Sequence, residues 1–168
     1  MGPRSRGDSV TILRPSTPAD VPFVSATLTR EFGFTQIWSR GQMFEALSLP
    51  AIIAAEQARS VGVAVLRFES QECELLALVA TGQRRGIGTL LLEAARDLAA
   101  KRSCRRLFLT TTNDNLDALR FYQRRGMKLV ALHPGAMDIA RRANPTIPAI
   151  GHYNIPMRDD LELEYILK

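Results

Sequence analysis

The chain has 168 residues, 46% of them hydrophobic and 23% charged, with a formal net charge of +5. This length suits one domain with a substantial core, and the composition is typical of a globular protein and excludes a wholly disordered one. No apolar run approaches the roughly 18 residues that span a bilayer, and the N-terminus lacks the apolar segment of a secretory signal, so we expect a cytoplasmic protein with no membrane partner. We expect residues 1–8 to be disordered and residues 9–168 to form the domain.

The first half of the chain alternates short apolar runs with helical patterns. Thr17 or Ser16 can cap a helix whose first turn accepts Pro18. Two β-rich runs joined by a short segment predict a hairpin, and a third, more continuously apolar run predicts a central strand. In chain order we expect a strand at 10–14, a helix at 17–32, a short helix at 39–47, and strands at 51–57, 61–69 and 72–80.

The second half continues the alternation of strands and helices. Apolar residues recur at helical spacing after residue 86, and Gly126 marks the end of a second helix. The final run alternates polar and apolar residues, which is typical of a half-exposed strand. We expect helices at 86–101 and 115–125, strands at 105–112, 127–133 and 157–167, and a loop-rich stretch at 134–156 with one helical turn at 137–142.

Positive charge is concentrated in the middle of the chain, and acidic residues dominate positions 159–164. A local basic region suits a nucleic acid, an anionic cofactor or an acidic partner. The sequence carries no RNP, zinc-finger or helix-turn-helix signature, so we expect no nucleic-acid partner. Cys73 and Cys104 belong to no metal-ligand cluster, and we expect two buried free thiols and no metal site.

The stretch TGQRRGIGTLLLEAA, residues 81–95, places arginines and glycines directly before an apolar helical pattern. The first N–H groups of a helix have no internal partner and carry the positive end of its dipole, so they bind anions. Gly86 and Gly88 remove the side chains that would keep a phosphate away, and Arg84 and Arg85 add charge. The alternative is a tight turn beside solvated arginines. The spacing fits neither a Walker A loop nor a Rossmann fingerprint.

Two motifs carry a resemblance to a known family. Gln83 to Gly88 match Q/R-x-x-G-x-G, and NLDALRFYQRRGM, residues 115–127, is similar to N-x-x-A-x-x-F-Y-x-x-x-G-F, with Met127 in place of Phe. Together they resemble the coenzyme A motifs of the GNAT superfamily of N-acetyltransferases. The resemblance implies an α/β (α+β) domain with a mixed, mostly antiparallel central sheet that is flanked by helices and splayed at the cofactor site.

This resemblance implies acetyl-CoA as the cofactor. Its pyrophosphate would bind the backbone of Arg84, Arg85, Gly86, Ile87, Gly88 and Thr89, and its pantetheine arm would run beside Leu76, Ala77 and Leu78. Those last three side chains can equally be plain core. Asn115 would contact the cofactor, cap the helix that follows it, or do both. Tyr122 occupies the family position of the acid that protonates the departing thiolate; the alternative is a tyrosine packed on the sheet with its hydroxyl bonded to backbone.

The sequence leaves undecided which residue is the base that accepts the proton of the amine. Many peptide-acetylating members of the family have Glu where this chain has Thr110, which cannot act as a base. Glu72 and Glu74 are the candidates, since their i, i+2 spacing places both on one face of a strand; the alternative is a pair of solvated charges. His133 and His152 fall near the expected acceptor side, although a lone histidine is more often structural.

These residues predict an acetyl-CoA-dependent N-acetyltransferase that acts on the primary amine of a small or amino-acid-like molecule by direct attack on the thioester. A coenzyme A-binding sensor without catalysis and an acetyltransferase for protein N-termini or lysines are the alternatives. Thr110 ranks peptides below small amines. We expect the acidic final strand and the proline-rich loop before it on the acceptor side, where Asp159, Asp160 and Glu162 could attract a cationic amine; the alternative is that these acids are mere surface. The sequence leaves open whether the chain forms a homodimer.

Overall fold

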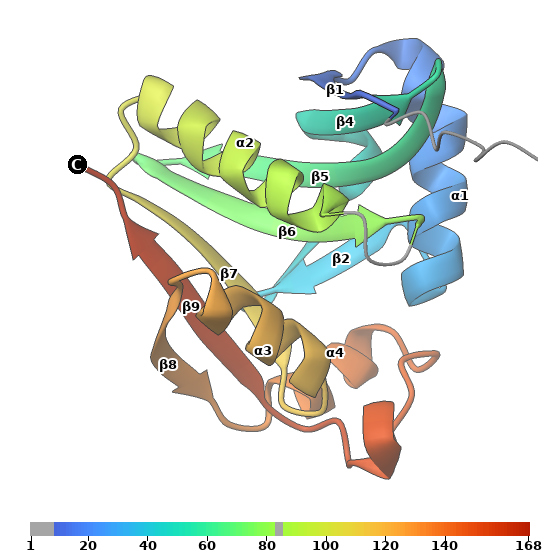
Figure 1. The fold of residues 1–168 in the computed structure, drawn as a ribbon. Helices are drawn as coiled ribbons and strands as arrows, with labels where there is room; N and C mark the ends of the chain where they lie inside the picture. Colours follow the sequence, from blue (N-terminus) through green and yellow to red (C-terminus); the bar gives the residue numbers. More distant parts are fainter. Residues whose placement is uncertain (1–8, 83–85) are drawn as a thin grey trace, which may run out of the picture.

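A seven-stranded sheet with strand order β1-β4-β5-β6-β7-β9-β8 forms the centre of the molecule (Figure 1). The computed structural model describes residues 9–82 and 86–168, so the expectations for residues 1–8 and for Gln83, Arg84 and Arg85 lie outside the described residues. The strands of this sheet are β1 Thr11–Pro15, β4 Ala51–Glu56, β5 Arg59–Glu69, β6 Glu72–Ala80, β7 Arg106–Thr112, β8 Lys128–His133 and β9 Asp160–Ile166. The α-helices are α1 Val21–Phe32, α2 Ile87–Lys101, α3 Leu116–Arg124 and α4 Ala136–Ala143.

The sheet is mixed and mostly antiparallel, as expected, and it opens between its two parallel strands. β6 and β7 pair in parallel from Glu72↔Arg106 to Glu74↔Phe108. Beyond these pairs β6 runs on to Ala80 while β7 runs on to Thr112, and the two strands diverge (Figure 1). The pairing of β6 with β5 also shifts register, because Val65 pairs with Ala77 and Leu66 with Leu75, which leaves Leu76 in a bulge. The expected splay is therefore present.

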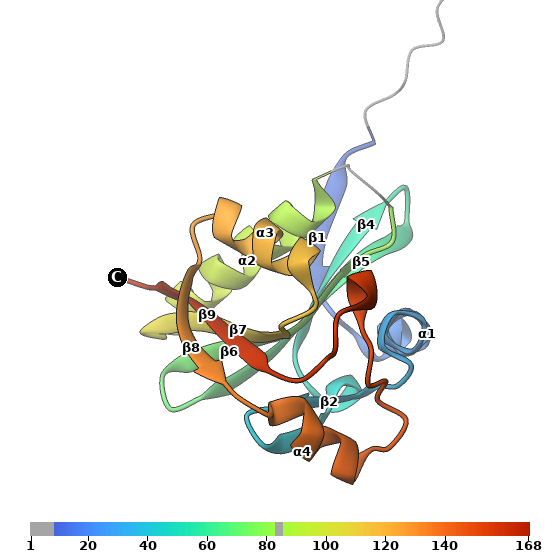
Figure 2. The same ribbon diagram turned by 90° about the horizontal axis from the view of Figure 1, so that it is seen from below.

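Helices cover both faces of the sheet. α2 and α3 lie on one face, whereas α1, α4 and a separate two-stranded hairpin at residues 36–45 lie on the other (Figure 2). α2 presents Ile87, Leu91, Ala95 and Ala99, spaced four residues apart, as one fully buried stripe. Beneath it a Cβ at Gly62 of β5 would lie 2.9 Å from side-chain atoms of both Ile87 and Leu91. Only glycine allows this close approach of helix and strand.

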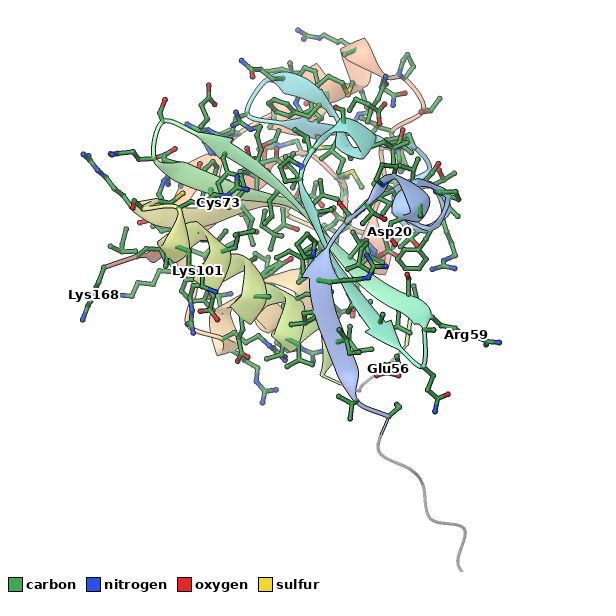
Figure 3. The ribbon with its side chains drawn as sticks, turned by 90° about the horizontal axis from the view of Figure 1, so that it is seen from above. Asp20, Glu56, Arg59, Cys73, Lys101 and Lys168 are labelled. Atoms are coloured by element: carbon green, nitrogen blue, oxygen red, sulfur yellow. The ribbon has the colours of Figure 1, made fainter. Side chains whose placement is uncertain are left out.

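The N-terminal end of α1 is fixed by an ion pair. Both carboxylate oxygens of Asp20 accept hydrogen bonds from the guanidinium of Arg14, each at 2.7 Å. One of them also accepts from the backbone N–H of Thr17, which caps a 3-10 turn, Pro18–Asp20, that leads into the helix. These donors hold the pKa of Asp20 well below its usual value. Figure 3 shows Asp20 beside the start of α1, where the chain leaves β1.

The expectation of a short helix at 39–47 is wrong. These residues form a hairpin, β2 Gln36–Ser39 paired with β3 Gln42–Glu45, followed by a 3-10 turn, Ala46–Ser48. Its two-residue loop consists of Arg40 and Gly41, whose φ angles are 49° and 80°, and two successive positive φ angles define the type I′ turn that suits tight hairpins. The helical turn expected at 137–142 is part of α4, and both cysteines are buried free thiols as expected.

Candidate active site

Two hollows adjoin the opening between β6 and β7. The first, which we name the glycine hollow, measures about 840 Å³ and is lined by Glu31, Leu78, Ala80, Gly82, Gly86, Ile87, Gly88, Thr89, Asn115, Asp117, Ala118, Arg120, Phe121, Tyr122, Arg124 and Arg125. The second, the apolar hollow, measures about 470 Å³ and lies on the side of β7 that α4 covers. Glu31 and Asn115 line both hollows, so the two are adjacent parts of one site.

The glycine hollow contains the N-terminus of α2. Gly86 takes φ +74° directly before the helix, and the first turn leaves backbone N–H groups without partners inside the helix. A Cβ at Gly88 would lie 3.3 Å from the Phe121 ring, so the absence of a side chain keeps the space between α2 and α3 open. The wall there is positive, since the Arg125 guanidinium lies 3.7 Å from the centre of the Phe121 ring. Its Nε also donates to the hydroxyl of Thr89 at 2.7 Å.

α3 brings Asn115 and Tyr122 to the glycine hollow. Asn115 caps the helix, because its Oδ1 accepts a hydrogen bond from the backbone N–H of Ala118 at 3.2 Å. Asn115 also lines the glycine hollow. Tyr122 is 9% exposed, and its hydroxyl makes no hydrogen bond to the described residues. Burial raises the pKa of Tyr122 above its usual value, so the phenol is protonated at neutral pH. The hollow is therefore lined by a phenol that carries its proton at neutral pH.

The side chains of β6 near its bulge line different parts of the site or pack in the core. Leu78 lines the glycine hollow and Leu76 lines the apolar hollow. Ala77 is buried in the core on the α1 side of the sheet. The strand thus separates the two hollows while its bulge turns the backbone at the point where β7 leaves it.

Neither glutamate proposed as a base lines either hollow. Glu74 is 1% exposed, and one of its oxygens accepts from the Nε and Nη2 atoms of Arg67 at 3.0 and 2.9 Å while the other accepts from Ser39. Glu72 is partly exposed and accepts from Nε of Arg106 at 2.8 Å. Both carboxylates are thus neutralised by arginines, which gives the hypothesis of a base at Glu72 or Glu74 no support. Glu74 is also not the solvated charge that the alternative required.

The apolar hollow is walled by aromatic and aliphatic side chains, of which the sequence placed Leu76 and the stretch from 134 to 157 near the site but not the residues from 32 to 38. Its apolar walls are Phe32, Phe34, Ile37, Trp38, Leu76, Met137, Ile147, Pro148 and Met157. Two of them, Ile37 and Trp38, come from β2 of the hairpin that the sequence did not predict. Its polar lining consists of Glu31, Thr110, Thr111, Thr112, Asn115, His152 and Asp160, together with the backbone at Gly151.

The acidic face of β9 is buried, which corrects the expectation that the polar side of this strand meets solvent. Asp160 and Glu162 are each 5% exposed. Glu162 accepts from Arg106 at 2.8 Å and contacts Nε2 of His133 at 3.0 Å. Asp160 makes no hydrogen bond through its carboxylate to the described residues and lines the apolar hollow.

His152 also pairs with a buried acid. The carboxylate of Asp114 is fully buried and accepts from the backbone N–H of His152 at 2.8 Å, with Nδ1 of the same residue at 3.0 Å. A Cβ at Gly151 would lie 2.0 Å from Oδ2 of Asp114, so the loop requires glycine there. Burial alone would raise the pKa of Asp114, but hydrogen bonds from Thr112 and His152 lower it. Both histidines therefore serve as partners of buried carboxylates.

Comparison with known proteins identifies the family. The model of the acetyltransferase (GNAT) family matches residues 19–127, which is more than half of the chain. The chain belongs to this family. Tyr122 and the residues from Gly86 to Asn115 that line the glycine hollow all fall within the match.

Relatives of this GNAT chain are similar in sequence or in fold. Protein YxbD of Bacillus subtilis is 42% identical over 103 residues, which cover 61% of this chain and 65% of YxbD, so the match spans less than two thirds of the relative. The IAA acetyltransferase from Bacillus cereus superposes with a TM-score of 0.69 at 17% identity, covering 94% of this chain and 100% of that one. A GNAT family acetyltransferase from Elizabethkingia anophelis with acetyl-CoA bound gives a TM-score of 0.67 at 18% identity, covering 94% and 98% of the two chains. At these identities the two structures show a shared fold.

The described residues of the GNAT chain contain neither a membrane-spanning helix nor a cluster of metal-binding side chains. Residues 9–82 and 86–168 contain no helix that is both long and apolar enough to cross a membrane. Over the same ranges no three His, Cys, Asp or Glu side chains come together as a candidate metal site.

Proposed function

We propose that this chain is an acetyl-CoA-dependent N-acetyltransferase that acetylates the primary amine of a small molecule. The observation that carries the proposal is the opening between β6 and β7, which has the N-terminus of α2 and the hydroxyl of Tyr122 on one side and a separate apolar hollow on the other. A transferase needs such a pair of adjoining sites, because two substrates must meet at one reacting centre. Membership in the GNAT family supports the same reaction.

The residues of the glycine hollow fit acetyl-CoA. The first-turn N–H groups of α2, from Ile87 to Thr89, face a space that a side chain at Gly88 would narrow, and Arg125 adds positive charge beside it. Leu78 and Asn115 line the continuation toward β6 and β7. Arg84 and Arg85 remain part of the proposal from sequence alone. When bound, the cofactor supplies an acetyl thioester; the protein holds it and excludes water from its reactive end.

Tyr122 is the proposed acid. Its phenol is buried at the hollow and holds its proton at neutral pH, so it can donate that proton to a thiolate leaving nearby. The expected result of Tyr122→Phe is a fall in turnover of about 100-fold, with little change in acetyl-CoA affinity, because only the hydroxyl is removed. Turnover is measured by release of free thiol and affinity by calorimetry. Unchanged turnover would remove Tyr122 from this role.

Gly88→Val tests the cofactor site itself. The new side chain would extend toward the Phe121 ring, which already lies 3.3 Å from the position of a Cβ, and we expect acetyl-CoA affinity to fall about tenfold. Asp97→Ala, an exposed change later in α2, is the matched control and is expected to bind as the unchanged protein does. If calorimetry detects no uptake of acetyl-CoA by the unchanged protein, the proposed function fails. Uptake without turnover on any amine would instead indicate a coenzyme A sensor.

A further inference from the structure

Asp160 is an unusual group within the apolar hollow. It is 5% exposed, it begins β9, and its carboxylate finds no hydrogen-bond donor among the described residues. A buried carboxylate is costly unless a cation or a donor meets it. The hollow that it lines is therefore where such a partner is expected.

The remaining lining of the apolar hollow indicates the chemistry of that partner. Glu31 is the other acidic residue of the lining, and within the described part of the chain no lysine or arginine belongs to it. A bound carboxylate group would find no lysine or arginine there, since the histidine of the lining, His152, already contacts Asp114, and it would meet two acids of its own sign. Trp38, Phe34 and Met157 offer broad apolar surfaces to a carbon skeleton. The lining thus favours a molecule with an apolar body and a positive end.

We infer that the acceptor is an apolar primary amine without a carboxylate group, whose body lies in the apolar hollow and whose ammonium is bound, and then deprotonated, by Asp160. This inference rests on the proposed function and names the substrate class of that site. Asp160 accepts one proton from the ammonium, the freed lone pair forms the C–N bond at the thioester carbonyl, and the C–S bond breaks. Tyr122 gives its proton to the leaving thiolate. The acylated nitrogen then loses its second proton, which returns to the Tyr122 oxygen once Tyr122 has protonated the thiolate. One acetyl group is transferred, and one net proton is returned to solvent when both side chains regain their resting states.

The position of Asp160 in the sheet supports contact with the reacting amine. Asp160 pairs with Thr112 of β7, on the strand that forms one side of the opening, and Thr110 and Thr111 line the same hollow. The other side of the opening contributes Leu76 at the bulge of β6. An amine held by Asp160 therefore lies on the side of the opening opposite to the glycine hollow.

Other charged groups around Asp160 have partners of their own. On β8, His133 stands opposite Asp160 and contacts Glu162 of β9, which Arg106 also binds. The neighbouring carboxylate of Asp159 accepts from the backbone N–H of Gly135 at 2.9 Å and from Arg158. On α4, Arg141 donates to Asp138 and to backbone carbonyls of Pro148 and Met157. On the loop after α4, His152 contacts Asp114.

This environment gives the proton transfer a defined pH dependence. Burial raises the pKa of Asp160 to about 6, although the charge of His133 opposes the shift. The carboxylate is therefore ionised at neutral pH and is a stronger base than an ordinary aspartate. An ammonium moved into the apolar hollow loses hydration, which lowers its own pKa and brings the two groups closer in proton affinity.

The first experiment compares three acceptors of the same skeleton: 2-phenylethylamine, phenylalaninamide and phenylalanine. We expect kcat/KM for the first two to exceed that for phenylalanine by about 100-fold, because only phenylalanine places an unpaired carboxylate in the hollow. Phenylalaninamide controls for the added bulk at the same carbon. Equal reactivity of phenylalanine and its amide would overturn the inference, as would a reaction confined to peptides with a free N-terminus.

The second experiment tests Asp160 itself with 2-phenylethylamine. We expect kcat/KM of the unchanged protein to rise with pH through about 6, and Asp160→Asn to abolish this rise and lower kcat/KM about 100-fold at pH 7.5. Asp160→Glu should restore part of the activity. Asp97→Asn, an exposed change on α2 outside both hollows, is the control and should keep both the rate and the pH profile.

Calorimetry with acetyl-CoA separates this inference from the proposed function. Because Asp160 does not line the glycine hollow, Asp160→Asn should bind acetyl-CoA as the unchanged protein does, which also shows that the variant is folded. Normal uptake together with full activity of Asp160→Asn would overturn the inference alone. Failure of the unchanged protein to bind acetyl-CoA would overturn the proposed function. A flat pH profile of the unchanged protein between pH 5 and 7 would count against Asp160 even if the variant failed to fold.

Discussion

Glu74 and Asp160 are two carboxylates buried to a similar degree, with exposed fractions of 1% and 5%, yet their surroundings differ completely. Glu74 receives hydrogen bonds from Arg67 and Ser39, which occupy both of its oxygens. Asp160 has no donor among the described residues and borders a hollow. A buried acid with a complete set of partners stabilises the fold, whereas one left open to a hollow is held ready for a ligand.

The largest expected change in stability concerns Glu74, the buried acid whose oxygens both accept hydrogen bonds. Glu74→Ala leaves Arg67, whose side chain is 15% exposed, with the surface residue Glu69 as its remaining acidic partner among the described residues, and empties a fully buried position. We expect the free energy of unfolding to fall by about 3 kcal/mol, measured by urea denaturation. Glu74→Gln keeps the shape and should lose less. A loss below about 1 kcal/mol for Glu74→Ala would show that the pair does not stabilise the fold.

For Asp160, the buried acid without partners, substitution is expected to raise the free energy of unfolding instead of lowering it. The folded-state pKa of Asp160 is raised to about 6, so between pH 4 and pH 6 the folded chain binds more protons than the unfolded chain, and stability falls as pH rises. Asp160→Asn should therefore raise the free energy of unfolding at pH 7.5 by an amount on the order of 2 kcal/mol and have little effect at pH 4. Thermal unfolding at both pH values, with the exposed change Asp97→Asn as control, measures the difference. Destabilisation at pH 7.5 would indicate that Asp160 has a stabilising partner after all.

The smallest effect is expected at Glu72. Its side chain is 37% exposed, and Arg106 keeps Glu162 and Glu164 when Glu72 is changed. Glu72→Gln should lower the free energy of unfolding by less than about 1 kcal/mol and leave turnover unchanged. Denaturation and thiol release are measured in parallel. A loss of turnover as large as that of Asp160→Asn would restore Glu72 as the candidate base and contradict the assignment of that role to Asp160.

Local patterns predicted the cofactor side of the site. Gly86 and Gly88 before an apolar stripe, Asn115 as a helix cap and Tyr122 in its motif all lie in the glycine hollow or at its edge. Each of these signals depends on residues within one turn or one helix of each other, so sequence spacing alone expresses it. The alternation of strands and helices is confirmed for the same reason, whereas the splay was implied by the family resemblance and not by local spacing.

The acceptor side was predicted only in part: the sequence indicated the final strand and the proline-rich loop, which both line the apolar hollow, but not the hairpin. The hairpin at Gln36–Glu45 was missed because its type I′ turn begins with Arg40 at φ 49°, where Asn, Asp or Gly is the usual signal. The alternation of β9 correctly placed its acids on one face, but which face meets solvent depends on α4 and the loops packed over it. Such packing joins Trp38, Met137 and Met157 with Asp160, residues that are far apart in the chain.

The opening between β6 and β7 has a consequence for hydrogen–deuterium exchange. Past Glu74 the edge of β6 that faces β7 pairs with no strand among the described residues, so we expect amide hydrogens on that edge to exchange faster than those bonded to β5. A ligand arm lying along this edge would slow exchange at alternate residues from Leu76 to Ala80 and leave their neighbours as they were. Alternating protection along one strand would report the course of the bound molecule without a crystal.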